Sequence, residues 1–164
     1  MRKKLILLLS VFVVLGTLLS SCNKVTVEVE KKKNEFFLRY YSQLSEYTYK
    51  SVEMPEIAPE GGAVYGYLNN NNPIKYGAVM FSELGRDEYD FYVIDEKTVY
   101  VTYVGITYSE SREKEGNSVK RTEDAFYVVD KDVYKTSETG IEKAAESYIY
   151  EMYQTAKTAF ESIL

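Results

Sequence analysis

The sequence predicts an α+β fold: an antiparallel sheet of about five or six strands with an N-terminal and a C-terminal helix packed on one of its faces. Short runs rich in β-branched and aromatic residues, separated by turn-forming residues, occupy residues 63–136. Segments on both sides of this region carry apolar residues at helical spacing. Strands and helices do not alternate along the chain, so a parallel sheet of βαβ units is not expected. A length of 164 residues suits one domain.

The first 21 residues are predicted to be an export signal. Three basic residues at positions 2–4 precede an apolar run, Leu5–Leu19. As a helix this run would span only about 22 Å, whereas a bilayer core of roughly 30 Å needs about 20 apolar residues. The pattern therefore favours a signal peptide over a transmembrane helix, with a short signal anchor as the alternative.

The apolar run ends in Leu19, Ser20, Ser21 and Cys22, which are an aliphatic residue, two small residues and the only cysteine of the chain. This order resembles the lipobox of bacterial lipoproteins, and the resemblance covers residues 1–22 alone. It implies cleavage before Cys22, diacylglycerol and palmitate-type acylation of that residue, and a lipid-anchored location in the cell envelope. Two or more acyl chains give stable anchoring. The alternative is ordinary signal cleavage, which would leave a free thiol.

The residue after the cysteine is Asn23 rather than the Asp that often retains lipoproteins in the inner membrane of diderm bacteria. The prediction therefore favours the outer membrane if the bacterium is a diderm. Residues 22–33 are predicted to be the lipidated cysteine and a polar tether, in which alternating valines could also form a short edge strand. Residues 34–164 are predicted to be a single α+β domain.

Asn34 is a suitable N-cap for a helix over residues 35–50. The apolar residues of this helix recur at three- and four-residue steps, and they are Phe37, Tyr40, Tyr41, Leu44 and Tyr47. Residues 51–62 contain two prolines and a Gly-Gly pair, which predict an irregular connection.

Six short strands are expected after this connection. The Asn69–Asn72 run predicts a turn, because Asn tolerates left-handed backbone. The polar segment Glu110–Thr122 predicts a hairpin tip. Phe91–Tyr100 and Phe126–Tyr134 are similar to each other, which suggests two similar hairpins. The expected strands are Ala63–Leu68, Lys75–Leu84, Tyr89–Ile94, Val99–Ser109, Ala125–Val129 and Val133–Thr136.

The C-terminal segment predicts an amphipathic helix that begins at a capping box formed by Thr139 and Glu142. Its apolar stripe is wide and needs a sheet or another helix to cover it. The stripe contains Ile141, Ala145, Tyr148, Met152, Ala156, Ala159 and Ile163, and it is widened by Ile149, Tyr153 and Phe160.

The composition excludes several kinds of chemistry. With no histidine and one cysteine, the chain cannot form a Ser-His-Asp triad, an internal disulfide or a Cys-rich metal site. No cofactor or metal is expected, and the acidic turns do not follow the calcium-loop pattern. Without residues 1–21 the chain has 17 basic and 25 acidic residues, a formal charge of −8, so nucleic acid is not an expected partner.

The chain has 17 tyrosines, and a tyrosine ring can pack on a sheet while its hydroxyl meets water. Five of them are predicted as a candidate binding surface: Tyr92, Tyr100, Tyr108, Tyr127 and Tyr134. Ordinary packing within strands and core is the alternative.

The predicted function is that of a membrane-anchored, non-catalytic binding or envelope-interaction domain, with an envelope protein or glycan as the partner. One alternative is a small periplasmic inhibitor or accessory subunit that binds through Glu110–Thr122. The other is a carboxylate-dependent glycan hydrolase. Candidate carboxylates are Glu83, Asp87, Glu88 and Glu123, although no spacing among them is diagnostic.

Overall fold

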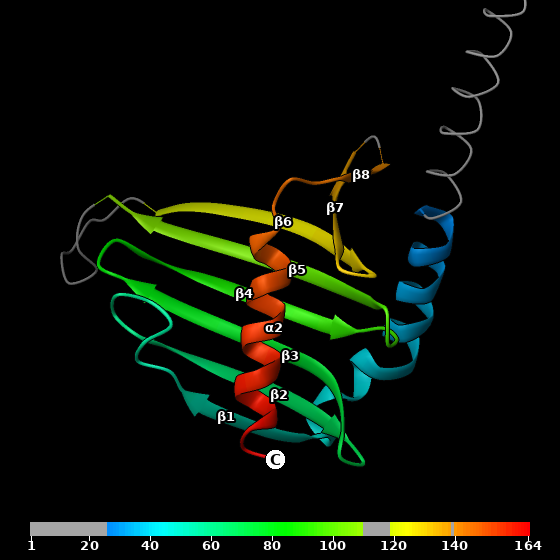
Figure 1. Cartoon of the computed structure of the whole chain (residues 1–164), viewed down its shortest axis with the longest axis horizontal. Helices are drawn as coiled ribbons and strands as arrows, with labels where there is room; N and C mark the ends of the chain where they lie inside the picture. Colours follow the sequence, from blue (N-terminus) through cyan, green and yellow to red (C-terminus); the bar gives the residue numbers. More distant parts are fainter. Residues whose placement is uncertain (1–25, 110–118, 139) are drawn as a thin grey trace, which may run out of the picture.

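Eight antiparallel strands form one sheet in which each strand pairs with the next strand along the chain (Figure 1). The computed structural model describes residues 26–109, 119–138 and 140–164. The antiparallel sheet is confirmed, but the predicted number of five or six strands was too low. The strands are β1 (Thr48–Glu53), β2 (Gly62–Asn69), β3 (Asn72–Ser82), β4 (Gly85–Val93), β5 (Thr98–Tyr108), β6 (Val119–Val129), β7 (Asp132–Ser137) and β8 (Gly140–Lys143).

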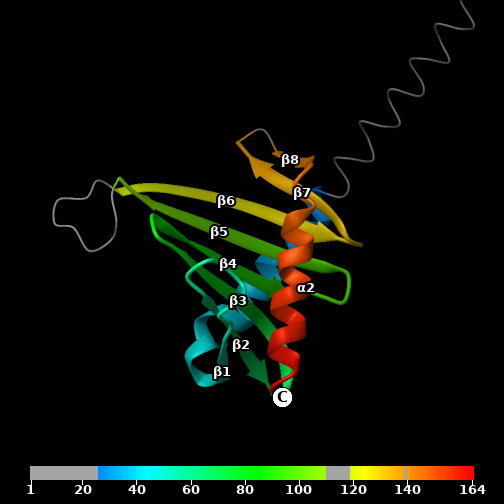
Figure 2. The same cartoon turned by 60° about the vertical axis from the view of Figure 1, so that its left-hand side comes forward.

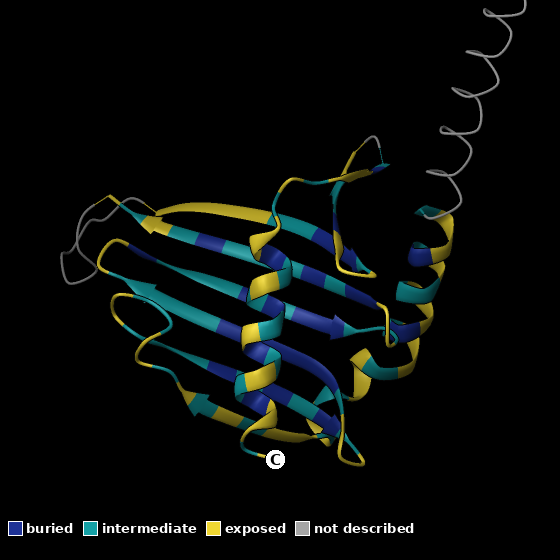
Figure 3. Cartoon of the chain, viewed as in Figure 1, coloured by how far each residue is buried: buried dark blue, intermediate teal, exposed yellow. Residues whose placement is uncertain are grey.

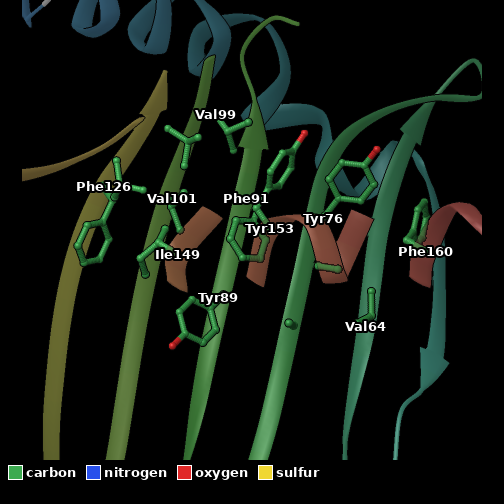
Figure 4. Packing of buried hydrophobic residues seen from close by; sticks show 14 of the residues in the cluster. Val64, Tyr76, Tyr89, Phe91, Val99, Val101, Phe126, Ile149, Tyr153 and Phe160 are labelled. Carbon is green, nitrogen blue, oxygen red and sulfur yellow. The ribbon is translucent and has the colours of Figure 1, made fainter. Parts of the chain in front are cut away.

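The C-terminal helix α2 (Tyr148–Glu161) lies across one face of the sheet, which we call the core face. Four of its side chains are buried there: Ile149, Tyr153, Ala156 and Phe160. They pack among apolar side chains of β2 to β6 (Figure 4). Those strand residues include Val64, Tyr76, Phe91, Val101 and Phe126, and together with α2 they form the main core.

The N-terminal helix (residues 26–40) packs on the opposite face of the sheet (Figure 2). Phe36 of this helix packs against Tyr92, whose strand neighbour Phe91 belongs to the core face. Successive side chains of a strand point to opposite faces, so the two helices cover different faces. The prediction that both helices pack on one face is therefore wrong. Since β4 and β6 carry large aromatic residues on both faces, each face needs a covering helix.

The N-terminal helix begins well before the predicted N-cap Asn34, which lies inside it. Residues 26–33 are therefore helical rather than an extended tether or an edge strand. Ion pairs one helical turn apart stabilise this segment, among them Glu28–Lys32 at 3.2 Å. Val29 is buried against the sheet and Val27 is 69% exposed, so of the two described valines of this run only Val29 packs in the domain.

The predicted helix over residues 35–50 also ends too late. The α-helix ends at residue 40 and continues as a 3₁₀ helix, η1 (Tyr41–Glu46), after which the chain enters β1. Strand β1 pairs along its whole length with β2, from Thr48 opposite Leu68 to Glu53 opposite Ala63. The pattern of aromatic and β-branched residues in β1 favours a strand once a pairing edge is present.

The predicted capping box at the start of the C-terminal helix is wrong. Glu142 lies in β8, which pairs with β7, while Thr139 lies outside the described residues. Ile141 is buried against Tyr127 and Val29, so tertiary packing holds this segment as a strand. Helix α2 starts only at Tyr148. Three of its four buried residues were expected only to widen the stripe, and the fourth, Ala156, belongs to the predicted stripe itself.

The two similar sequence segments do form two similar hairpins, β4–β5 and β6–β7, as predicted. The β6–β7 hairpin turns through Asp130 and Lys131, whose φ angles of 49° and 81° are left-handed. The β2–β3 hairpin turns through Asn70 and Asn71 in the same way, with φ angles of 50° and 66°. Short turns of this kind set the register between neighbouring strands.

Candidate functional site

One residue from each strand contributes to a single row that crosses the whole sheet. Neighbours in the row are directly paired across strands, and six of the eight members are tyrosines. We call this the tyrosine row, and the face that carries it the tyrosine face. Its members in strand order are Tyr49, Tyr67, Lys75, Tyr92, Tyr100, Tyr127, Tyr134 and Lys143.

The register brings four of the five predicted tyrosines together in this row. Tyr100 is the central one, with its ring centroid 6.1 Å from that of Tyr92 and 5.1 Å from that of Tyr127. Tyr134 follows on β7. Tyr108 points to the same face but lies eight residues along β5 from Tyr100, so it is separate from the cluster.

The central tyrosines are not an exposed surface. Tyr92 is 5% exposed and Tyr127 is fully buried, because the N-terminal helix lies along the row. The ring centroid of Phe37 in this helix lies 4.9 Å from that of Tyr92, in a tilted contact, and 5.9 Å from that of Tyr100, in an edge-to-face contact. For Tyr92 and Tyr127 the prediction of a binding surface is therefore wrong in this conformation. The sequence predicts both helices on one face of the sheet, so it does not predict that the N-terminal helix covers these tyrosines on the other face.

An ion-pair and hydrogen-bond group fastens the helix to the row. Tyr127 donates a 2.6 Å hydrogen bond to Glu30, and Lys33 lies 2.6 Å from the other carboxylate oxygen. Burial raises the pKa of Glu30, but these two partners outweigh burial and hold the pKa below its usual value. Burial and the adjacent carboxylate raise the pKa of Tyr127 well above its usual value, so its hydroxyl keeps its proton.

Lys75 is the buried cation of the row, and sequence analysis missed it. Its ammonium group lies 2.9 Å from Asp90 and faces the rings of Tyr65, Tyr67 and Tyr92 at 5.1 to 5.7 Å. Tyr65 also donates a 2.7 Å hydrogen bond to Asp90. The charges are therefore satisfied inside the sheet face, and the group acts as a polar support of the row. In the sequence, the alternation of Tyr65 and Tyr67 in β2 was the pattern that could have indicated this site.

Beyond the N-terminal helix, the tyrosine face contains a hollow of about 440 Å³. Strands β5 and β6 form its floor with Tyr100, Thr102, Val104 and Glu123, all at positions on this face. The bent β7–β8 hairpin contributes a wall through residues 136–138. The hollow thus combines an aromatic ring, hydroxyl groups and carboxylates, and Tyr100 is the predicted tyrosine that lines it.

The candidate carboxylates do not form one adjacent pair. Glu83 lies in the turn before β4, and Asp87 lies on the core face, where Tyr103 donates to it at 2.7 Å. Glu88 and Glu123 share the tyrosine face but are two strands apart, which is about 10 Å between Cα atoms. Each of these two contacts the arginine two residues before it, at 2.6 and 2.5 Å. These contacts make them components of surface ion pairs.

Some predicted features fall outside the described residues: the lipobox with Cys22, Leu19, Ser20 and Ser21, and positions 110–118 of the expected hairpin tip. Within the described ranges, no helix is long and apolar enough to span a membrane. In the same ranges, no cluster of three or more acidic, cysteine or histidine residues could hold a metal ion.

The fold defines the chain as an antiparallel meander with a helix on each face. Comparisons with known protein families, curated proteins and solved structures find no match for it.

Proposed function

We propose that this chain is a lipid-anchored, non-catalytic binding protein of a bacterial cell envelope, with the hollow beside Tyr100 as its ligand site. The observation that carries the site is the make-up of the hollow. Thr102 and Thr136 bring hydroxyl groups, and Glu123 and Glu138 bring carboxylates, around Tyr100. The anchor is supported by the order of residues 19–22 in the sequence.

The chemistry of the hollow suits an envelope glycan. Carboxylates accept hydrogen bonds from sugar hydroxyls, and threonine hydroxyls both donate and accept. An aromatic residue among a few convergent polar groups is typical of a small-ligand site. The excess of carboxylates favours a neutral or amino-bearing glycan over an acidic one.

The position of the N-terminal helix bears on how the site would be presented. Its described part starts at residue 26, four residues after Cys22. Four residues reach at most about 14 Å. A diacylglycerol on Cys22 would therefore hold the sheet close to the membrane, without a long tether.

Two experiments test the two parts of the proposal. Incorporation of labelled fatty acid by the full chain, with Cys22→Ser as the negative variant, tests the anchor. Equal labelling of the two chains, or none of either, would contradict it.

Binding to purified envelope glycans tests the hollow. We expect Thr102→Val to weaken binding by about tenfold, because it removes one hydroxyl at nearly constant shape. Thr107→Val is the matched control, since it lies on the same strand but on the other face. Failure of the unmodified chain to bind any glycan, or equal binding by both variants, would overturn the assignment.

A further inference from the structure

Half of strand β6 has an unpaired edge. Strand β7 pairs with β6 only over Phe126–Val129, although β6 begins at Val119. The Thr136 hydroxyl donates a 2.9 Å hydrogen bond to the carbonyl of Ala125, which takes the place of the next backbone bond. Residues 119–123 are exposed, and on the side away from β5 no described strand lies beside them (Figure 3).

The backbone groups that point to this edge can be assigned from the hairpin. In a two-residue hairpin the residues flanking the turn, Val129 and Asp132, form a hydrogen-bonded pair. Odd-numbered residues of β6 therefore direct their N–H and C=O groups toward the β7 side. On the unpaired edge these residues are Val119, Arg121 and Glu123.

The side chains along the edge form an antiparallel charge palindrome. Its sequence is Lys120-Arg121-Thr122-Glu123-Asp124, with two basic residues, a neutral centre and two acidic residues. If β6 of a second copy lies antiparallel with Thr122 opposite Thr122, Lys120 faces Asp124 and Arg121 faces Glu123. Every charge then has an opposite charge across the strand pair, on both faces of the sheet.

Other registers lose this complementarity. A shift by one residue places edge-directed backbone groups opposite groups that are already bonded to β5, so the ladder cannot form. A shift that keeps the hydrogen bonds places Arg121 opposite Arg121 or Glu123 opposite Glu123. Charges on an edge strand normally prevent pairing with other chains. Here they oppose the two neighbouring registers that keep the hydrogen bonds, and they favour the one with Thr122 opposite Thr122.

We propose that two copies of this chain associate through β6, antiparallel and with Thr122 on the twofold axis, so that the two eight-stranded sheets form one continuous sheet. The charges remain available for this contact. Within the chain, Arg121 lies near one oxygen of Glu123, and Lys135 lies near one oxygen of Asp124. Each carboxylate therefore has a second oxygen that can contact a basic residue of the other copy. The inference does not depend on the lipid anchor or on the glycan.

Cross-linking of the purified full-length chain tests the register. In the proposed pair the two Thr122 residues form a non-hydrogen-bonded pair with Cα atoms about 4.5 Å apart, a distance that a disulfide spans. Thr122→Cys is therefore expected to give a disulfide-linked dimer under mild oxidation. Lys120→Cys is the matched control, because its two copies would lie about 14 Å apart along the strands. The unmodified chain controls for cross-links through Cys22.

Charge reversal tests the cause. In the Thr122→Cys chain, Arg121→Glu places like charges opposite each other and should reduce the dimer fraction at least fivefold. Adding Glu123→Arg restores opposite charges and should return the fraction to its original level. Circular dichroism checks that each variant is folded. A monomeric Thr122→Cys chain, equal cross-linking of Lys120→Cys, or no recovery in the double reversal would overturn the proposal.

Discussion

The hydroxyl of Tyr127 on β6 lies 2.6 Å from the carboxylate of Glu30 on the N-terminal helix, across 97 residues of sequence. Lys33 occupies the other oxygen of that carboxylate and also faces the rings of Tyr100 and Tyr127 at 5.2 and 6.0 Å. One helix face therefore supplies both the acceptor for a buried hydroxyl and a cation for the rings. This connection explains why the helix covers the centre of the tyrosine row.

Removing the Tyr127 hydroxyl should weaken this connection. We expect Tyr127→Phe to lower the free energy of unfolding by about 1–2 kcal/mol, because a half-buried carboxylate loses a donor. Urea unfolding measures the change. Tyr47→Phe is the matched control, since its hydroxyl bonds Gln43 at an exposed site, and it should cost little. Equal effects of the two variants would mean that the bond to Glu30 contributes nothing specific.

Acid should loosen the same helix. The pKa of Glu30 lies below its ordinary value of 4.5, because hydrogen bonds to the charged form outweigh the effect of burial. Asp95 lies 3.0 Å from Lys32 of the same helix, and its pKa lies below its ordinary value of 3.8 for the same reason. For a lowered pKa the stabilisation is present above the unfolded pKa, and it is lost as the pH falls through the folded pKa. Stability should therefore fall below about pH 4.5.

The contribution of Glu30 can be isolated by Glu30→Gln. This variant should be less stable than the unmodified chain at pH 7, and the difference should shrink as the pH falls below 4.5. Urea midpoints measured from pH 3 to 7 give the profile. Glu35→Gln, on the exposed side of the same helix, serves as the control. A difference that stayed constant with pH would contradict this role of Glu30.

The close approach of α2 to β2 depends on the absence of a side chain at Gly66. A Cβ atom at this position would lie 2.7 Å from the Phe160 ring, which is fully buried. Gly66→Ala is therefore expected to lower the free energy of unfolding by about 1–3 kcal/mol through overpacking. In the double variant with Phe160→Leu the two costs should be less than additive. Strict additivity in urea unfolding would show that the ring is not the obstacle.

The hairpins and their turns were the most predictable part of this fold. Left-handed turn residues and alternating apolar residues placed each of the six expected strands on an observed one, although three of them were expected to end one or two residues later than they do. The similar segments Phe91–Tyr100 and Phe126–Tyr134 correctly indicated two hairpins, because local turn geometry fixes local register. The same local pairing places Tyr92 opposite Tyr100 and Tyr127 opposite Tyr134.

The ends of the domain were not predictable in the same way. Residues 25–29 alternate like a strand, and residues 48–50 belong to the predicted helix. In the structure, residues 26–29 are helical and residues 48–50 start β1. Packing of Val29 and pairing of β1 with β2 decide between these conformations, and neither contact is local. The burial of Tyr127 has the same cause, since it depends on which face the helix covers.

The buried ion pair of Lys75 and Asp90 gives a final test of the row. Their side chains are 11% and 26% exposed, and three tyrosine rings surround the ammonium group. Lys75→Met removes the cation and leaves Asp90 without its counter-charge, so we expect a loss of about 2 kcal/mol, less than for a fully buried pair. Asp90→Asn leaves Lys75 without its counter-charge in the same way.

The double variant distinguishes the pair from its parts. With Lys75→Met and Asp90→Asn together, neither side chain carries a charge, and the methionine still fills the space among the rings. We therefore expect the double variant to be more stable than at least one of the single variants in urea unfolding, because the penalty of an unpaired charge is absent. Two independent losses that simply add would show that the lysine and the aspartate do not stabilise each other, and that the rings alone hold this part of the row.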